Sequence, residues 1–254
     1  MSMLLGLQRG ILYGPVRSRR LGFSLGINLL PPGHKLCDFD CVYCQYGWTD
    51  AALLARAGEL AFPAPEEVAA ALRAALPGCD PPPAYLTFSG NGEPTLHPRF
   101  GEVVAAVTAV RDELLPAART AILSNGARAG VPEVRDALRR LDVRILKLDA
   151  GAAELFGRYN RPAAGITLAS VVDGLRALGG VTLQSLFTGG PGGNSGEPEV
   201  REWLAAARAV APLAVQIYTL ARGYPSQRIA PLERERLLEI RDRAAAAGLA
   251  AEVF

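Results

Sequence analysis

The segment CDFDCVYC occupies residues 37–44 and places three cysteines within eight positions of a 254-residue chain. The fourth cysteine, Cys79, stands alone. An odd cluster of thiols is a poor disulfide framework, and in a reducing compartment it is more typical of a metal or iron–sulfur site. We therefore expect this segment to hold a metal centre, and the rest of the chain to form the fold around it.

The spacing of the three thiols distinguishes between kinds of metal centre. A structural zinc ion takes four ligands, usually from two separated CxxC pairs, and the sequence has no second pair. His34 lies only three residues before Cys37, where a fourth ligand would be cramped. A four-iron cluster normally takes four cysteines, so three would leave one iron open to an exogenous ligand. A pure electron carrier has no need of that open position.

Outside the cysteine segment, apolar runs of strand length alternate with amphipathic stretches. The expected strands are residues 23–30, 84–89, 120–124, 143–148, 181–187 and 213–219. The expected helices are residues 65–76, 99–114, 132–141, 166–178, 197–210 and 231–247. This alternation predicts parallel strands joined by right-handed crossovers.

These elements predict an α/β fold, a partial (β/α)6 barrel of mainly parallel strands. We expect a single domain over residues 1–254, because no internal repeat or long run of charge divides the sequence. Within it, residues 31–48 form the cluster loop and residues 23–220, approximately, form the barrel. Residues 231–254 add a C-terminal helix and a candidate edge strand.

Polar residues occur in every expected strand, although strands buried on both faces are usually apolar throughout. Lys147 and Asp149 are two positions apart, so they share one face, while Leu146 and Leu148 take the other. If the apolar face packs on helices, the polar face lines a ligand-holding interior. The alternative is that these residues sit at strand ends and meet water. The polar set is Asn28, Thr87, Ser89, Ser124, Lys147, Asp149, Gln184 and Gln216.

The overall charge and hydropathy pattern narrow the class of protein. Lys and Arg number 27 against 25 Asp and Glu, a net charge of +2 that is too balanced to predict nucleic-acid binding by bulk charge. No apolar run approaches the roughly 18 residues that a membrane span needs. The first residues, MSMLLGLQRGILYG, lack the basic leader and the apolar length of a secretory signal. We expect a cytoplasmic protein with no membrane partner.

Four motifs taken together resemble those of the radical S-adenosylmethionine (radical SAM) superfamily. The first is Cys37-x3-Cys41-x2-Cys44, with the aromatic Tyr43 just before the last cysteine. The others follow the ends of expected strands and read Gly90-Asn91-Gly92-Glu93-Pro94, Leu123-Ser124-Asn125-Gly126 and Lys147-Leu148-Asp149. Residues 18–32 and 215–225 also resemble a small subgroup of Fe–S oxidoreductases related to wyosine-type tRNA-modifying synthases.

The resemblance implies a cofactor set and a role for each matching residue. Cys37, Cys41 and Cys44 would ligate three irons of a [4Fe-4S] cluster, and S-adenosyl-L-methionine (SAM) would chelate the fourth. The remaining implied SAM contacts are Gly90, Gly92 and Glu93 with the amino group, Tyr43 with adenine, and Ser124, Asn125 and Asp149 with the ribose or carboxylate, Lys147 being a weaker candidate. One departure is visible, because Asn91 displaces the second glycine of the family's Gly-Gly-Glu-Pro.

The implied activity is reductive cleavage of SAM to a 5′-deoxyadenosyl radical, which abstracts hydrogen from a substrate. A small metabolite, a peptide and an RNA base all remain open as substrates. The small net charge and the lack of cysteines for a second cluster do not favour tRNA. The resemblance implies a one-electron donor such as flavodoxin or ferredoxin. The alternative from another class is a non-catalytic Fe–S electron carrier or a metal-binding accessory protein.

Several residues have two interpretations that the sequence leaves open. Lys147 and Asp149 either contact the cofactor or form an ion pair at the barrel rim, since buried charges must be paired. The cluster Arg17, Arg19 and Arg20 either anchors a phosphate or acidic substrate or is a solvated surface. The glycine-rich residues 189–196 are either a lid or a passive connection. We expect Cys79 to be a plain thiol and His34 a polar loop residue.

Overall fold

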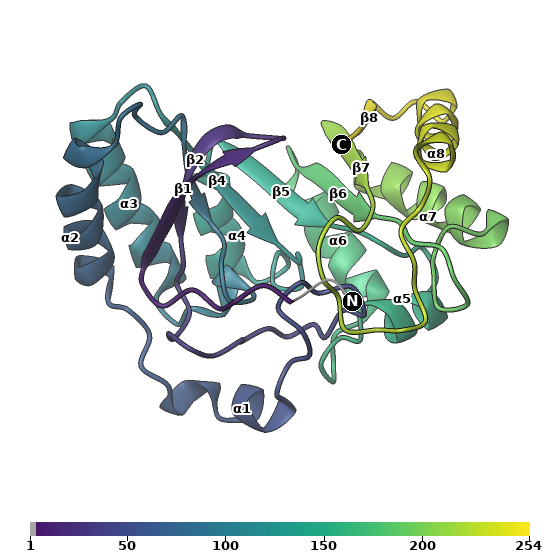
Figure 1. Ribbon diagram of the computed structural model, residues 1–254, viewed down its shortest axis with the longest axis horizontal. Coiled ribbons are helices and arrows are strands. Elements are labelled where there is room, and N and C mark those ends of the chain that lie inside the picture. Colours follow the sequence, from purple (N-terminus) through teal and green to yellow (C-terminus); the bar gives the residue numbers. More distant parts are fainter. Residues whose placement is uncertain (1–3) are drawn as a thin grey trace.

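The computed structural model describes residues 4–254, and its centre is one curved sheet of eight strands in the order β1-β2-β3-β4-β5-β6-β7-β8 (Figure 1). β1 runs antiparallel to β2, and every later pair of neighbours is parallel. The strands are β1 (Leu12–Ser18), β2 (Gly22–Ile27), β3 (Tyr85–Phe88), β4 (Arg119–Ser124), β5 (Val143–Lys147), β6 (Thr182–Leu186), β7 (Ala214–Tyr218) and β8 (Ala251–Val253).

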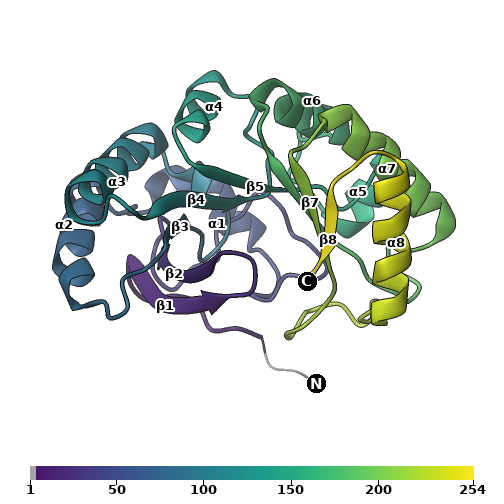
Figure 2. The ribbon, with the colours of Figure 1, turned by 90° about the horizontal axis from the view of Figure 1, so that it is seen from above.

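Helices cover the convex outer face of the sheet, as the view from above shows (Figure 2). The longer ones are α2 (Pro65–Ala75), α3 (Phe100–Leu114), α4 (Pro132–Arg139), α6 (Leu168–Leu178), α7 (Glu197–Val210) and α8 (Arg234–Ala246). The shorter ones are α1 (Ala51–Ala55), α5 (Ala153–Tyr159) and the single-turn η1 (Ala57–Glu59), η2 (Leu76–Gly78) and η3 (Pro94–Leu96). No helix within residues 4–254 combines the length and apolarity needed to cross a membrane.

The predicted α/β fold is confirmed, as an open barrel with a mostly parallel sheet. The six expected strands are β2 to β7, the candidate edge strand is β8, and the six expected helices are α2, α3, α4, α6, α7 and α8. The sequence analysis missed β1, α1 and α5. β1 contains Gly14-Pro15, a pair typical of turns, and the two helices are too short to show a helical period.

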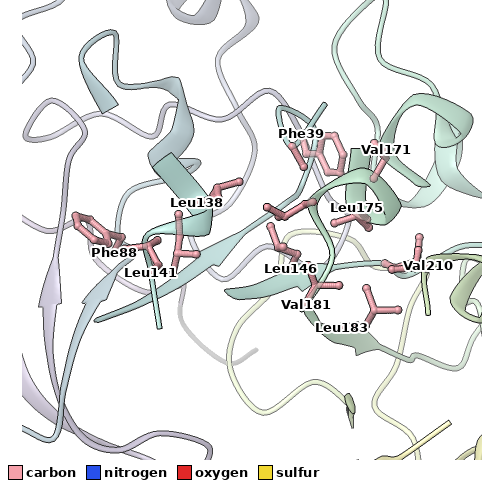
Figure 3. Packing of buried hydrophobic residues seen from close by; sticks show 14 of the residues in the cluster. Phe39, Phe88, Leu138, Leu141, Leu146, Val171, Leu175, Val181, Leu183 and Val210 are labelled. Atoms are coloured by element: carbon pink, nitrogen blue, oxygen red, sulfur yellow. The ribbon is translucent and has the colours of Figure 1, made fainter. Parts of the chain in front are cut away.

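The hydrophobic core lies between the outer face of the sheet and the helices (Figure 3). Leu146 of β5 and Leu183 of β6 are fully buried in the same cluster as Leu175 of α6. Because side chains alternate along a strand, the neighbouring Lys147 and Gln184 point to the concave side. The apolar face predicted from the sequence therefore forms the core, and the polar face lines the barrel interior.

The concave side is apolar toward the amino ends of the strands and polar toward their carboxyl ends. Leu21, in the turn between β1 and β2, packs inside the barrel with Ala121 of β4 and Ile145 of β5. Nearer the carboxyl ends, one polar residue from each of β5, β6 and β7 is paired in register. This row consists of Lys147, Gln184 and Gln216.

Candidate functional site

The cysteine segment follows β2 and crosses the carboxyl ends of the next three strands. Leu36 pairs with Gly92 after β3, the thiol of Cys37 lies near Asn125 after β4, and that of Cys41 lies near Asn160 beyond β5. All three cysteines of the segment are half-buried free thiols. The sheet thus gathers three distant stretches of sequence around the cysteine segment.

The glycine motif after β3 is joined to the cysteine segment by backbone hydrogen bonds. Leu36 N donates to Asn91 O at 2.9 Å, and Leu36 O accepts from Glu93 N at 3.0 Å. Gly92, between them, has a φ of +144°, and a β-carbon there would lie 1.9 Å from Leu36 O. Glycine at this position is required by the close approach of the cysteine segment.

Asn91, the residue that departs from the family motif, anchors the N-terminal segment. Its Oδ1 accepts from Gln8 N at 2.7 Å, and its Nδ2 donates to Gln8 O at 2.9 Å. Farther along, Leu5 N donates to Gln45 O at 2.8 Å. Gly90, directly before Asn91, has a φ of +135°, a conformation that side chains rarely adopt. The departure is therefore accounted for by a contact that glycine could not make.

Glu93 joins the ends of β3 and β4. Its Oε1 accepts from Ser124 Oγ at 2.8 Å and from Thr95 Oγ1 at 2.6 Å, and its Oε2 accepts from Asn125 N at 2.7 Å. Burial, and secondly the charge of Asp38, raise the pKa of Glu93 to about 7. The structure thus brings the expected residues Glu93, Ser124 and Asn125 together, and the hydroxyl of Ser124 donates its hydrogen bond to the carboxyl group of Glu93.

Asn125 also connects β4 to the first cysteine. Its Nδ2 donates to Asp38 Oδ1 at 2.5 Å and lies 3.8 Å from Cys37 Sγ. Burial raises the pKa of the Cys37 thiol well above its ordinary value, and the charges of Asp38 and Glu93 raise it further. Sequence reasoning missed Asp38, although its place inside the cysteine segment was a signal.

Asp149, after β5, is the second polar centre of the site. Its Oδ1 forms an ion pair with Lys147 Nζ at 2.9 Å and accepts from Leu186 N at 2.8 Å. Its Oδ2 accepts from Asn160 Nδ2 at 2.9 Å and from the hydroxyl of Tyr43. The ion pair expected as one alternative is therefore present, and the same carboxylate orients the tyrosine of the cysteine segment.

Asn160, which the sequence analysis missed, is the residue that links Asp149 to the second cysteine. It follows the last residue of α5, is buried, and places Nδ2 3.6 Å from Cys41 Sγ. Its Oδ1 is buried without a hydrogen-bond partner. Burial, with the charge of Asp149, raises the pKa of the Cys41 thiol to about 12. No local motif marks Asn160, because only tertiary packing brings it here.

The glycine-rich residues 189–196 are tied down by Asn194. Its side chain donates to Asp149 O at 2.9 Å and to Leu186 O at 2.8 Å, and it accepts from Thr188 N at 2.8 Å. The loop therefore fastens the end of β6 to Asp149, which agrees with a connection rather than a lid.

Two residues considered in the sequence lie apart from these contacts. Cys79 follows η2, and its thiol donates to Ala75 O at 3.5 Å. His34 is exposed and lines a shallow surface pocket with Asp50 and Arg56.

The residues present fit an iron–sulfur cluster. The three thiols lie along one loop, with amide N–H groups of Asn125 and Asn160 directed at the sulfurs of Cys37 and Cys41. The unpartnered Oδ1 of Asn160 offers an acceptor beside them. Such N–H donors are the usual surroundings of iron–sulfur thiolates.

The family model described as the radical SAM superfamily matches residues 34–204, which include the cysteine segment and the motifs after β3, β4 and β5. The chain belongs to the radical SAM superfamily. Proteins of this superfamily use a [4Fe-4S] cluster and SAM, so the expected cofactors are confirmed.

Individual proteins similar to this radical SAM chain agree with that assignment. A UPF0026 protein of Helicobacter pylori is 36% identical over 152 residues, which are 60% of this chain and 46% of the relative. The chain thus spans about half the length of such curated relatives. A radical SAM methyltransferase from Sphaerobacter thermophilus has a TM-score of 0.63 at 16% identity, covering 91% of this chain and 65% of that one. TYW1 with a lysine-pyruvate adduct has a TM-score of 0.57 at 14% identity, covering 88% and 73%. Identities this low show a shared fold.

Proposed function

We propose that this protein is an enzyme that cleaves SAM reductively and uses the resulting radical to abstract hydrogen from a substrate. When bound, the cluster and SAM supply the one-electron cleavage that yields methionine and a 5′-deoxyadenosyl radical. The observation that supports the proposal is the convergence of the motifs after β3, β4 and β5 on the cysteine segment, in two hydrogen-bonded clusters around Glu93 and around Asp149.

The cysteine segment would bind three irons through Cys37, Cys41 and Cys44. Asn125 and Asn160 would donate N–H groups to the thiolates of Cys37 and Cys41. Hydrogen bonds of this kind stabilise negative charge on the sulfurs and raise the reduction potential. The two amides would therefore ease the uptake of the electron.

Carboxylates and backbone at the strand ends would hold SAM. Glu93, with Gly90 and Gly92 beside it, offers a buried acceptor for the ammonium group. Ser124, Asn125, Tyr43, Asp149 and Lys147 are the further proposed contacts to the ribose, carboxylate and adenine. Glu93 and Asp149 are both almost completely buried, which favours the exclusion of water around a reactive carbon radical.

The substrate would enter the polar half of the concave face. Lys147 Nζ donates to Tyr218 Oη at 2.9 Å, and Tyr218 Oη donates to Gln184 Oε1 at 3.2 Å. These contacts form a polar wall that runs from Asp149 across β5, β6 and β7. The proposal includes a cytoplasmic location and flavodoxin or ferredoxin as the electron donor.

The experiment that tests the proposal compares two single cysteine variants after anaerobic reconstitution. We expect wild type, given SAM and dithionite, to release 5′-deoxyadenosine detectable by chromatography. Cys41→Ala should lose both the cluster and the product, whereas Cys79→Ala, outside the site, should keep both. SAM cleavage by Cys41→Ala would refute the cluster assignment. A wild-type cluster that yields no product, and whose reduced EPR signal SAM leaves unchanged, would favour an electron carrier.

A further inference from the structure

Arg20 is separated by the fold from the two arginines that accompany it in sequence. Arg17 and Arg19 are exposed, whereas Arg20, in the turn between β1 and β2, is half-buried. Its guanidinium carbon lies 4.2 Å from the ring centroid of Tyr218 and 5.5 Å from that of Phe254. In both views this turn faces the C-terminus across the open side of the barrel (Figures 1 and 2).

The guanidinium of Arg20 has no counter-charge. Within residues 4–254 no carboxylate lies at salt-bridge distance from it, and its Nε is buried without a hydrogen-bond partner. Burial lowers its pKa, the hydroxyl of Tyr218 acts in the opposite direction, and the positive charges of Arg19 and Arg222 lower the pKa further. Burying a cation without a counter-charge is unfavourable, so an anion bound beside Arg20 would relieve a cost that the described residues leave unmet.

The rings fix the guanidinium but leave its charge unsatisfied. The guanidinium lies over the ring of Tyr218, which restrains its position and contributes a cation–π attraction. The N–H groups of a guanidinium form a planar fork, and such a fork matches a carboxylate or phosphate. The arrangement therefore preorganises Arg20 for a bidentate contact with an oxyanion.

Arg20 also lies beside the wall where the substrate would enter. The hydroxyl of Tyr218 is bonded to Lys147 and Gln184, and Gln184 Nε2 donates to Gln216 Oε1 at 3.1 Å. Lys147 is already paired with Asp149. The uncompensated positive charge of this wall is thus that of Arg20, with Arg222 near it.

We propose that Arg20, held over the ring of Tyr218 at the open side of the barrel, binds the carboxylate or phosphate group of a small-molecule substrate. The inference rests on the proposed function, since it names the chemical class of the molecule that the radical would attack. A small molecule is favoured over a polynucleotide because Arg20 is recessed and the chain's net charge is only +2.

The test uses inorganic phosphate and succinate as probes and succinamide as the neutral control. Binding to the full reconstituted chain is measured by calorimetry and by the ligand-dependent rise in melting temperature. We expect saturable binding of phosphate or succinate, weakened roughly tenfold or more in Arg20→Gln. Arg19→Gln, the exposed neighbour, should bind as wild type does, and succinamide should not bind.

Three results would overturn the proposal. The first is that phosphate and succinate bind to Arg20→Gln as tightly as to wild type, or bind to neither protein. The second is that Arg20→Gln has a lower melting temperature than wild type without probe, but shows the same rise in melting temperature when probe is added. Arg20 would then stabilise the contact between the β1–β2 turn and the C-terminal strands rather than bind an anion. The third is Arg20-dependent binding of tRNA alone. Release of 5′-deoxyadenosine is measured separately on wild type, so its absence would count against the proposed function and not against the oxyanion site.

Discussion

Replacing Gly92 by alanine should detach the cysteine segment from the end of β3. The added β-carbon would lie 1.9 Å from Leu36 O and 2.5 Å from Leu36 C, whereas real β-carbons essentially never come within 3.0 Å of such atoms. The obstructing atoms are backbone, so no side-chain rotation can relieve the contact. The segment before Cys37 must move outward by about 1 Å, which is the difference between the 3.0 Å limit and the 1.9 Å to Leu36 O.

The free energy cost follows from what this displacement breaks. Two backbone hydrogen bonds flank Gly92, from Leu36 N to Asn91 O and from Glu93 N to Leu36 O, at 2.9 and 3.0 Å. Each contributes roughly 0.5–1.5 kcal/mol. A side chain at a φ of +144° adds about 1–3 kcal/mol of backbone strain. We expect Gly92→Ala to lower the free energy of unfolding by roughly 2–6 kcal/mol.

The matched control is Gly165→Ala. Gly165 also has a positive φ, +87°, but a β-carbon there meets nothing within 4 Å, so this variant measures strain without the clash. Urea denaturation gives the stability of each variant, and iron and sulfide content after reconstitution reports whether the thiols still hold a cluster. Gly92→Ala should lose most of its cluster, and Gly165→Ala should keep it. If the two variants unfold alike and bind equal iron, the close approach at Leu36 does not position the cysteines.

Two further predictions concern Glu93 and Asn160. Burial raises the pKa of Glu93 from 4.5 to about 7, so the folded apoprotein binds this proton more tightly than the unfolded chain does. The protonated carboxyl group therefore stabilises the fold by up to roughly 3 kcal/mol. This stabilisation is fully present below pH 4.5, the pKa in the unfolded chain, and is lost as the pH rises through 7. Glu93→Gln should lack this loss in urea denaturation across that pH range, and an unchanged pH profile would contradict the prediction. Asn160→Leu removes the N–H directed at Cys41 Sγ and should make the cluster's reduction potential more negative in an EPR-monitored titration. An equal reduction potential in wild type and Asn160→Leu would show that this amide does not act on the cluster.

Hydrophobic periodicity was sufficient to predict the parallel strands and their helices. Leu146 and Leu148 alternate with Lys147 and Asp149 in the sequence, and the structure places the first pair in the core and pairs the second. β1 escaped detection because its Gly14-Pro15 interrupts the strand pattern, and the structure accommodates this pair as an irregularity in the antiparallel hairpin with β2.

The arrangement of the candidate site could be predicted from the sequence as far as its motifs are local. Cys37, Glu93 and Asp149 follow strand ends or lie in the cysteine segment, so parallel topology alone brings them to one side. Asn160 reaches that side because the end of α5 packs on the cysteine segment, with its backbone oxygen accepting from Asp40 N at 3.1 Å. Likewise, the sequence could not tell which arginine of the turn points inward, since Arg20 is selected by the distant Tyr218.

The attachment of the N-terminal segment has a practical consequence for preparing the protein. Leu5 is bonded to Gln45, the residue after Cys44, and Gln8 to Asn91 in the glycine motif. An affinity tag fused shortly ahead of Leu5 would therefore start close to the cysteine segment, where the histidines of a tag would compete for metal. Spectroscopic samples are better tagged at a site distant from Leu5.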